Sequence, residues 1–234
     1  MLPRRPAARA LVVALAVVTV VHLVAQLADA GGLADVTQAL LMPLLAGALW
    51  LETSSPRSRL VALTLVALGL SWLGDTAPKL VGGDAAFLVM VGFFLLAQLA
   101  YIKAFLPYRA ASVLHVRRPL LLAYAAAVIG LVAACVPGAG GLLVPVLVYG
   151  ACLGAMAVLS TGVNRATAVG GALFLVSDGL IALDVFVPGF GLPAQGFWVM
   201  ATYVAAQSLI VAGVLLEQNR RGTRAAQQDV VHSG

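Results

Sequence analysis

The chain has 234 residues, of which 62% are hydrophobic and only 10% are charged, and its net charge is +5. A soluble domain is about 25% charged, and apolar runs of about 20 residues recur throughout this sequence, which excludes a soluble domain. The runs are continuous rather than alternating, which excludes a transmembrane barrel. The basic residues lie in short loops and at both ends without interleaved aromatic residues, so no nucleic acid partner is expected. The composition predicts an all-α integral membrane protein.

Eight transmembrane helices are predicted, separated by short segments rich in Gly, Pro, Ser and charged residues. In chain order we expect them at residues 8–28, 33–51, 59–76, 84–106, 119–136, 142–160, 166–186 and 195–216. They form a bundle within a single polytopic membrane domain, residues 1–216. The polar tail, residues 217–234, is predicted to be disordered.

The first apolar segment has two interpretations. Its basic start, its apolar run and the sequence Ala28-Asp29-Ala30 resemble a signal peptide with a cleavage site. The apolar run is long for a signal peptide, which favours a retained span. Cleavage would leave seven spans and the same arrangement of loops.

The distribution of positive charge predicts the orientation. With eight spans, alternate loops fall on opposite sides of the membrane. Of the 14 Lys and Arg residues, all except Lys79 fall on the side that carries both termini. By the positive-inside rule this side is cytoplasmic, and we expect a multi-pass protein of the cell membrane. Membrane lipids are expected partners, and some of the basic residues are placed to contact anionic headgroups.

Two carboxylates stand inside apolar spans. Asp75 follows "SWLG" in the third span, and Asp178 lies in "GGALFLVSDGLIALDVFV" of the seventh. A carboxylate at the centre of a membrane helix costs about 2.5–3.5 kcal/mol on insertion scales, and less near the interface. The third and seventh spans run in the same direction, so both acids fall in the outer half of the bundle. Their matched depth predicts a shared polar cavity.

A weak parallel internal repeat relates the third and fourth spans to the seventh and eighth. "LSWLGD" followed by "FLLAQLAYI" resembles "LFLVSD" followed by "YVAAQSLIV". The repeat would place Asp75 and Gln98 in positions that correspond to Asp178 and Gln207.

Further polar side chains occur on spans that can reach this cavity. Those predicted to bind a substrate are Thr37, Gln38, Gln98, Tyr101, Ser177, Tyr203 and Gln207. Each of them alone is more typical of a hydrogen bond between membrane helices than of a functional site. Lys79 lies one turn from Asp75 and could neutralise it. No cluster of His, Cys and carboxylate residues has the spacing of a metal site, so we expect no metal and no cofactor.

Five segments occur here in the order and spacing of a known family. They are "TQALLMPLLAGAL", "SWLGD", "GFFLLAQLAYIKAF", "FLVSDGLIALD" and "TYVAAQSLI", and on them residues 33–216 resemble the YhhN-like lysoplasmalogenases. The resemblance implies a membrane hydrolase that cleaves the vinyl ether bond of a lysoplasmalogen. The substrate is then a lysophospholipid, and the products are a fatty aldehyde and a glycerophospho-base.

The resemblance also implies roles for individual residues. Asp75 and Asp178 match the family's acids and are expected to be catalytic, and Tyr101, Tyr203 and Gln207 match motif positions. At two sites the chain departs from the family. It has Gln38-Ala39 where Lys-Pro is common, and Gln98 where His is common. Both changes remove a group that can be cationic, which puts the headgroup and the level of activity in doubt.

The chemistry suits two carboxyl groups. A vinyl ether hydrolyses when its β-carbon is protonated to an oxocarbenium ion, to which water then adds. One carboxyl group acts as the acid and the other as a carboxylate, a division of labour similar to that in glycosidases. A poorly solvated carboxyl group retains its proton more readily, which suits an acid. Apolar neighbours favour Asp178 in this role, whereas Lys79 favours an ionised Asp75.

Two other functions fit the same residues. A small-solute or proton-coupled transporter would use the carboxylate pair in a pathway that opens alternately to both sides. A non-catalytic lipid-binding membrane protein would explain the two departures from the family. The sequence leaves the headgroup, the choice of acid and the oligomeric state open.

Overall fold

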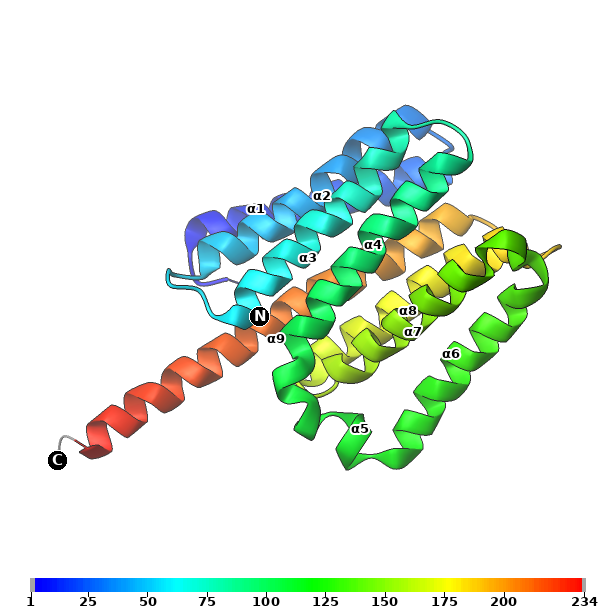
Figure 1. Ribbon diagram of the computed structural model, residues 1–234. Helices are drawn as coiled ribbons and strands as arrows, with labels where there is room; N and C mark the ends of the chain where they lie inside the picture. Colours follow the sequence, from blue (N-terminus) through cyan, green and yellow to red (C-terminus); the bar gives the residue numbers. More distant parts are fainter. Residues whose placement is uncertain (1–2, 233–234) are drawn as a thin grey trace.

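The computed structural model describes residues 3–232, except for the side chains of residues 84, 118, 224–226 and 228–232. Helices make up 87% of it, and the described residues contain no strand, so the predicted all-α fold is confirmed (Figure 1). The long helices are α1 (Pro6–Leu27), α2 (Gly31–Glu52), α3 (Arg59–Thr76), α4 (Asp84–Phe105), α6 (Arg118–Ala139), α7 (Leu143–Ser160), α8 (Arg165–Phe186) and α9 (Gln195–His232). Shorter helices are η1 (Ala77–Leu80), η2 (Leu106–Ala111), α5 (Val113–Val116) and η3 (Gly140–Leu142).

Within the described residues, seven helical stretches are long and apolar enough to cross a membrane. One of them, Pro119–Ser160, contains both α6 and α7, which pack against each other as a hairpin around η3. Gly140 makes this turn with φ at +48°, a conformation that glycine adopts without steric cost. The protein is therefore a multi-pass integral membrane protein, and the eight predicted spans correspond to α1–α4 and α6–α9.

Side-chain caps start two of the helices after predicted breaks. Asn164 begins α8, because its Oδ1 accepts hydrogen bonds from the backbone N–H groups of Ala166 and Thr167 while Thr167 Oγ1 accepts from the Asn164 N–H. Ser58 caps α3 by accepting from the Val61 N–H. These caps satisfy N–H groups that have no partner within the first turn of a helix.

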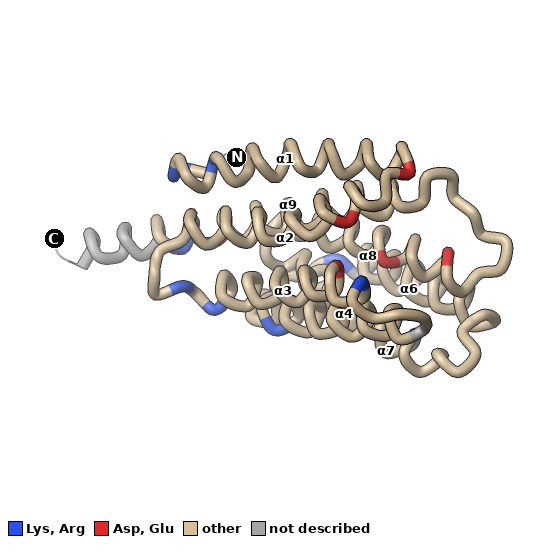
Figure 2. Tube along the Cα trace, turned by 90° about the horizontal axis from the view of Figure 1, so that it is seen from above, with Lys and Arg blue, Asp and Glu red and all other residues tan. Residues whose placement is uncertain are grey.

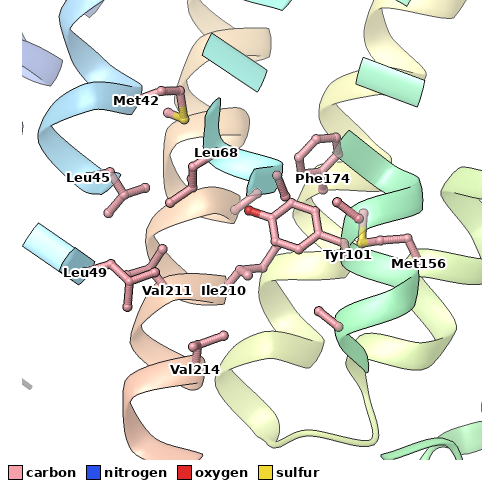
Figure 3. Close-up of a cluster of buried hydrophobic side chains, with 14 of the residues drawn as sticks. Met42, Leu45, Leu49, Leu68, Tyr101, Met156, Phe174, Ile210, Val211 and Val214 are labelled. Carbon is pink, nitrogen blue, oxygen red and sulfur yellow. The ribbon is translucent and has the colours of Figure 1, made fainter. Parts of the chain in front are cut away.

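Consecutive long helices pair along the chain except α4 and α6, and α9 packs inside the bundle. It contacts α1, α2 and α3 as well as α8, its neighbour in sequence. In Figure 3, α9 side chains lie between those of α2 and those of α4, α7 and α8. The labelled residues of this core are Met42, Leu45, Leu49, Leu68, Tyr101, Met156, Phe174, Ile210, Val211 and Val214. The core fills the middle of the bundle.

The tail that the sequence predicts to be disordered instead continues α9 as a helix to His232. Its residues are mostly good helix formers, and Glu217 and Arg221 form an i,i+4 ion pair of 3.1 Å. Gln218 also accepts a hydrogen bond from Ser58 Oγ at 2.7 Å, which ties the start of this extension to the bundle.

The basic segments meet at one end of the bundle. Arg5 donates to Ser54 at 2.7 Å, and the guanidinium of Arg221 lies 4.9 Å from the ring centroid of Tyr108. Figure 2 shows most Lys and Arg residues toward the end that carries both termini, whereas most Asp residues lie toward the other end. The fold therefore separates charge as the loop arrangement predicts. Which end faces the cytoplasm stays a prediction.

Candidate functional site

A cavity of about 330 Å³ opens in the half of the bundle opposite the basic end, and Asp75 and Asp178 both line it. Each is a buried residue with 7% of its surface exposed. The other lining residues are Gln26, Gln38, Gly74, Pro78, Lys79, Met90, Phe94, Ser177, Ile181, Gly196, Val199, Met200 and Tyr203. They come from α1, α2, α3, η1, α4, α8 and α9, so the site exists only when the bundle is assembled.

Asp75 lies near the end of α3 and has a hydrogen-bond donor on each carboxylate oxygen. Its Oδ1 accepts from Gln38 Nε2 at 3.3 Å, and its Oδ2 accepts from the Tyr203 hydroxyl at 2.9 Å. The preceding Gly74 lets the Phe94 ring pack closely, since a Cβ at residue 74 would lie 2.8 Å from that ring. Donors on both oxygens hold Asp75 as an acceptor, the role of a carboxylate.

The side chain of Gln38 links the ammonium group of Lys79 to Asp75. Lys79 Nζ donates to Gln38 Oε1 at 3.0 Å, and Gln38 Nε2 faces Asp75. Because an ammonium group can only donate, this contact fixes the orientation of the amide and turns its NH₂ toward the carboxylate. Lys79 itself forms an ion pair with Asp35 Oδ1 at 2.7 Å, and its side chain is 32% exposed. Lys79 therefore acts on Asp75 through an amide instead of pairing with it directly.

Asp178 lies in α8 and has both of its donors on one oxygen. The Tyr149 hydroxyl donates to Oδ2 at 2.6 Å, and Gln98 Nε2 donates to the same atom at 3.1 Å. Among the described residues, no hydrogen bond reaches Oδ1. That oxygen is the one that can carry a proton or meet a ligand in the cavity.

Each of the two acids accepts a hydrogen bond from the other half of the predicted internal repeat. Asp75 of α3 accepts from Tyr203 of α9, whereas Asp178 of α8 accepts from Gln98 of α4. Gln207 of α9, the counterpart of Gln98, donates to Ser71 Oγ one turn before Asp75 at 3.0 Å. The pair α3 and α4 thus supplies Asp75 and a hydrogen-bond donor to Asp178. The pair α8 and α9 supplies Asp178 and a donor to Asp75.

Three residues predicted to bind a substrate have partners elsewhere in the protein. Tyr101 and Gln207 are fully buried in the core, where the Tyr101 hydroxyl donates to Gln207 Oε1 at 2.6 Å. Thr37 faces α1, where its Oγ1 lies 2.9 Å from His22 Nδ1. None of the three lines the cavity. Ser177 does line it, although its hydroxyl donates to the Val199 carbonyl oxygen at 3.0 Å.

A sequence model described as the YhhN family matches residues 33–214. The chain belongs to the YhhN family. The resemblance seen in its five segments is thereby confirmed, and the matched region covers most of α2, all the helices from α3 to α8 and the first part of α9, whereas α1 lies before it.

Relatives of this YhhN-family chain carry informative names. Proteins named lysoplasmalogenase from Mycobacterium bovis and Mycobacterium tuberculosis are each 35% identical to it over 169 residues. The match covers 70% of this chain and 64% of either relative. The mouse protein named lysoplasmalogenase TMEM86B is 37% identical over 75 residues, 32% of each chain. No solved structure matches this YhhN-family protein.

Three residues at this site were not predicted from the sequence. Tyr149 donates to Asp178 but stands alone in the apolar segment "LLVPVLVYGACLG", where no neighbouring polar residue marks it. Gln26 reaches the cavity from α1, outside the family match, and Met200 reaches it from α9. The lone tyrosine in an apolar span was the one available signal, since a buried tyrosine hydroxyl usually has a hydrogen-bond partner.

Proposed function

We propose that this YhhN-family protein hydrolyses the vinyl ether bond of lysoplasmalogens in the cell membrane. The observation that carries the proposal is the single cavity lined by Asp75 and Asp178. Vinyl ether hydrolysis needs both a proton donor and a negative charge beside the reacting carbons. The names of the mycobacterial and mouse relatives support the same reaction. The products are a fatty aldehyde and a glycerophospho-base.

The two carboxyl groups take different roles in this proposal. Asp178 is the acid, because its Oδ1 is unengaged while Tyr149 and Gln98 hold Oδ2. Asp75 is the carboxylate that faces the developing positive charge, because both of its oxygens are held as acceptors. This arrangement assigns acid and base by environment, as two-carboxyl glycosidases do.

The reaction then proceeds in three steps. Asp178 transfers its proton to the β-carbon, and the C=C electron pair forms the new C–H bond, which leaves an oxocarbenium ion beside Asp75. Water adds to the α-carbon and gives up a proton to a carboxylate, which produces a hemiacetal. The hemiacetal loses its hydroxyl proton, the C–O bond to the glycerol breaks, and that oxygen is protonated. One water is consumed in total.

Lys79 and Gln38 stand at the polar side of the cavity and are proposed to bind the phosphate of the headgroup. The Lys79 ammonium group is partly exposed and lines the cavity. It supplies the cation that the substitutions at residues 38 and 98 leave missing from this site. Binding energy at the headgroup would hold the vinyl ether in place for reaction.

The orientation of the site follows from the same proposal. With the basic end in the cytoplasm, the cavity opens toward the outer leaflet. Closely packed hydrophobic side chains fill the middle of the bundle (Figure 3), which favours a hydrolase whose site opens to one side of the membrane over a transporter that opens alternately to both.

The direct test is to incubate the purified protein with a lysoplasmalogen and, in parallel, with the ester lysolipid of the same headgroup and chain. We expect fatty aldehyde from the first and no fatty acid from the second. The Asp75→Asn/Asp178→Asn double variant serves as the control for contaminating activity. Absence of aldehyde with every headgroup tried would contradict the proposed function.

A further inference from the structure

A second, apolar groove lies between α4 and α6, with α7 and α8 as its floor. Its walls include Val91 of α4, Leu131 and Cys135 of α6, and Val146 of α7. The polar side chains among its lining residues are Asp178 and Tyr149, which hydrogen bond to each other. A groove with this lining suits a hydrocarbon chain whose one reactive end meets the carboxyl group.

The groove adjoins the polar cavity. Four residues line both spaces, namely Met90, Phe94, Asp178 and Ile181. Asp178 therefore stands where a polar and an apolar compartment meet. A molecule that occupied both would place the junction between its headgroup and its chain at this acid.

The groove is open sideways and closed at its end. In the described part of the chain, no Cα atom of α4 lies within 8 Å of one in α6, and Leu88 on the rim is 49% exposed. At the end of the bundle, the rings of Phe87 and Phe186 pack edge to face with centroids 5.9 Å apart. There α6 also comes into close contact with α8, because Gly138 lies against the Phe186 carbonyl. In Figure 1, α4 and α6 lie on either side of α7 and α8.

We propose that this groove binds the single hydrocarbon chain of the substrate, which enters sideways from the membrane between α4 and α6. The proposal rests on the function proposed above and adds the site of the chain. The headgroup then lies in the polar cavity beside Lys79, and the first carbons of the chain lie against Asp178. In a lysoplasmalogen those carbons are the vinyl ether.

The groove also predicts a preference for one chain over two. Another apolar groove, which includes Ile129, Ala151 and Ala155, lies on a different face of α6 and α7. It shares no lining residue with the polar cavity. A lipid with two chains could seat only one of them beside Asp178.

The test compares Leu131→Trp, which fills the groove, with Ile129→Trp, which adds the same side chain to α6 but lines the other groove. Lipid tails are as apolar as the groove, so the groove contributes by positioning the chain and not by the transfer of apolar surface. We expect Leu131→Trp to lower turnover of a long-chain lysoplasmalogen by about 10-fold or more. A water-soluble vinyl ether with a two-carbon chain should be affected much less, and Ile129→Trp should match the wild type on both. If Leu131→Trp leaves the ratio of long-chain to short-chain turnover unchanged, the groove does not bind the chain.

A second measurement is independent of turnover. A non-cleavable lysophosphatidylethanolamine with a diazirine in mid-chain is photolysed with the wild-type protein in nanodiscs, and the labelled peptides are identified by mass spectrometry. We expect label on α4 and α6 residues of the groove, and its loss in Leu131→Trp but not in Ile129→Trp. Label confined to the face of Ile129 overturns the proposal. If the groove is labelled but no lysoplasmalogen is cleaved, the proposed function is wrong and the chain-binding site is supported. If lysoplasmalogen is cleaved but the groove is unlabelled, the proposed function is supported and the chain-binding site is wrong.

Discussion

Asp75 and Asp178 are equally buried, yet their surroundings differ in kind. Asp75 faces an amide that a lysine orients, and donors hold both of its oxygens. Asp178 has both donors on one oxygen and stands between the polar cavity and an apolar groove. The same residue type thus has surroundings that suit the two proposed roles, because the partner helices supply different neighbours. This asymmetry is what the following experiments test.

The largest effect is expected for Asp178→Asn. Loss of the proton donor should lower turnover by about 10²–10⁴-fold, the usual scale for a general acid. The variant should still fold and insert, since an amide in place of a protonated carboxyl group adds no charge to the membrane helix. Aldehyde release in the steady state measures the first point, and thermal unfolding in detergent measures the second. Wild-type turnover in this variant would remove Asp178 from the mechanism.

Asp75→Asn should lose about 10²-fold, less than Asp178→Asn, because the oxocarbenium ion loses a stabilising charge but the proton donor remains. The double variant should be little worse than Asp178→Asn, because groups that act as a unit are not additive. The comparison is made on one substrate at saturation. A reversed order of the two single variants would exchange the roles of the two acids.

The two tyrosines offer a matched pair. Tyr203→Phe removes a donor from Asp75 and Tyr149→Phe removes one from Asp178, and each change deletes only a hydroxyl group. A hydrogen bond to a charged group contributes about 1.5–3 kcal/mol, so Tyr203→Phe should cost about 10–100-fold in turnover. Tyr149→Phe should cost about 10-fold or less, because Gln98 still holds Oδ2 of Asp178. Equal losses would argue that both acids carry the same charge.

A smaller effect on binding is expected for Lys79→Gln. The exposed ammonium group should raise affinity for a phosphate headgroup by about 1 kcal/mol, so its loss should raise KM about 5-fold with kcat little changed. A phosphate-free vinyl ether should show no such change. The control is Lys103→Gln, which removes a lysine near the C-terminal end of α4, far from the cavity, and should leave KM unchanged. A fall in kcat on both substrates would instead assign Lys79 to the chemistry through Gln38.

The smallest effect on turnover is expected for Thr37→Val. Thr37 precedes Gln38 but points to His22, away from both acids. Turnover should stay within about twofold of the wild type, whereas the lost hydrogen bond should lower stability by about 1 kcal/mol. Thermal unfolding alongside an activity assay separates the two. A loss of turnover comparable to that of Tyr203→Phe would place Thr37 in the site after all.

The sequence by itself determined the membrane class, the eight helices and the two acids. These follow from local properties: apolar runs long enough to cross a bilayer, turn residues between them, and carboxylates that are costly in lipid. Gln38 and Tyr203 could also be predicted as site residues from the sequence, because polar residues in apolar spans are few. The family followed from the order of five short segments and not from any one of them.

Only the tertiary structure decided which polar groups meet. A helix presents side chains in every direction, so its sequence does not tell which direction faces a partner helix. That is why Tyr101 and Gln207 proved to pair in the core, Thr37 to face His22, and Tyr149 to reach Asp178. The link from Lys79 through Gln38 to Asp75, and the apolar groove that ends at Asp178, depend on the packing of α2 with α3 and of α4 with α7 and α8. No local pattern in the sequence encodes such contacts.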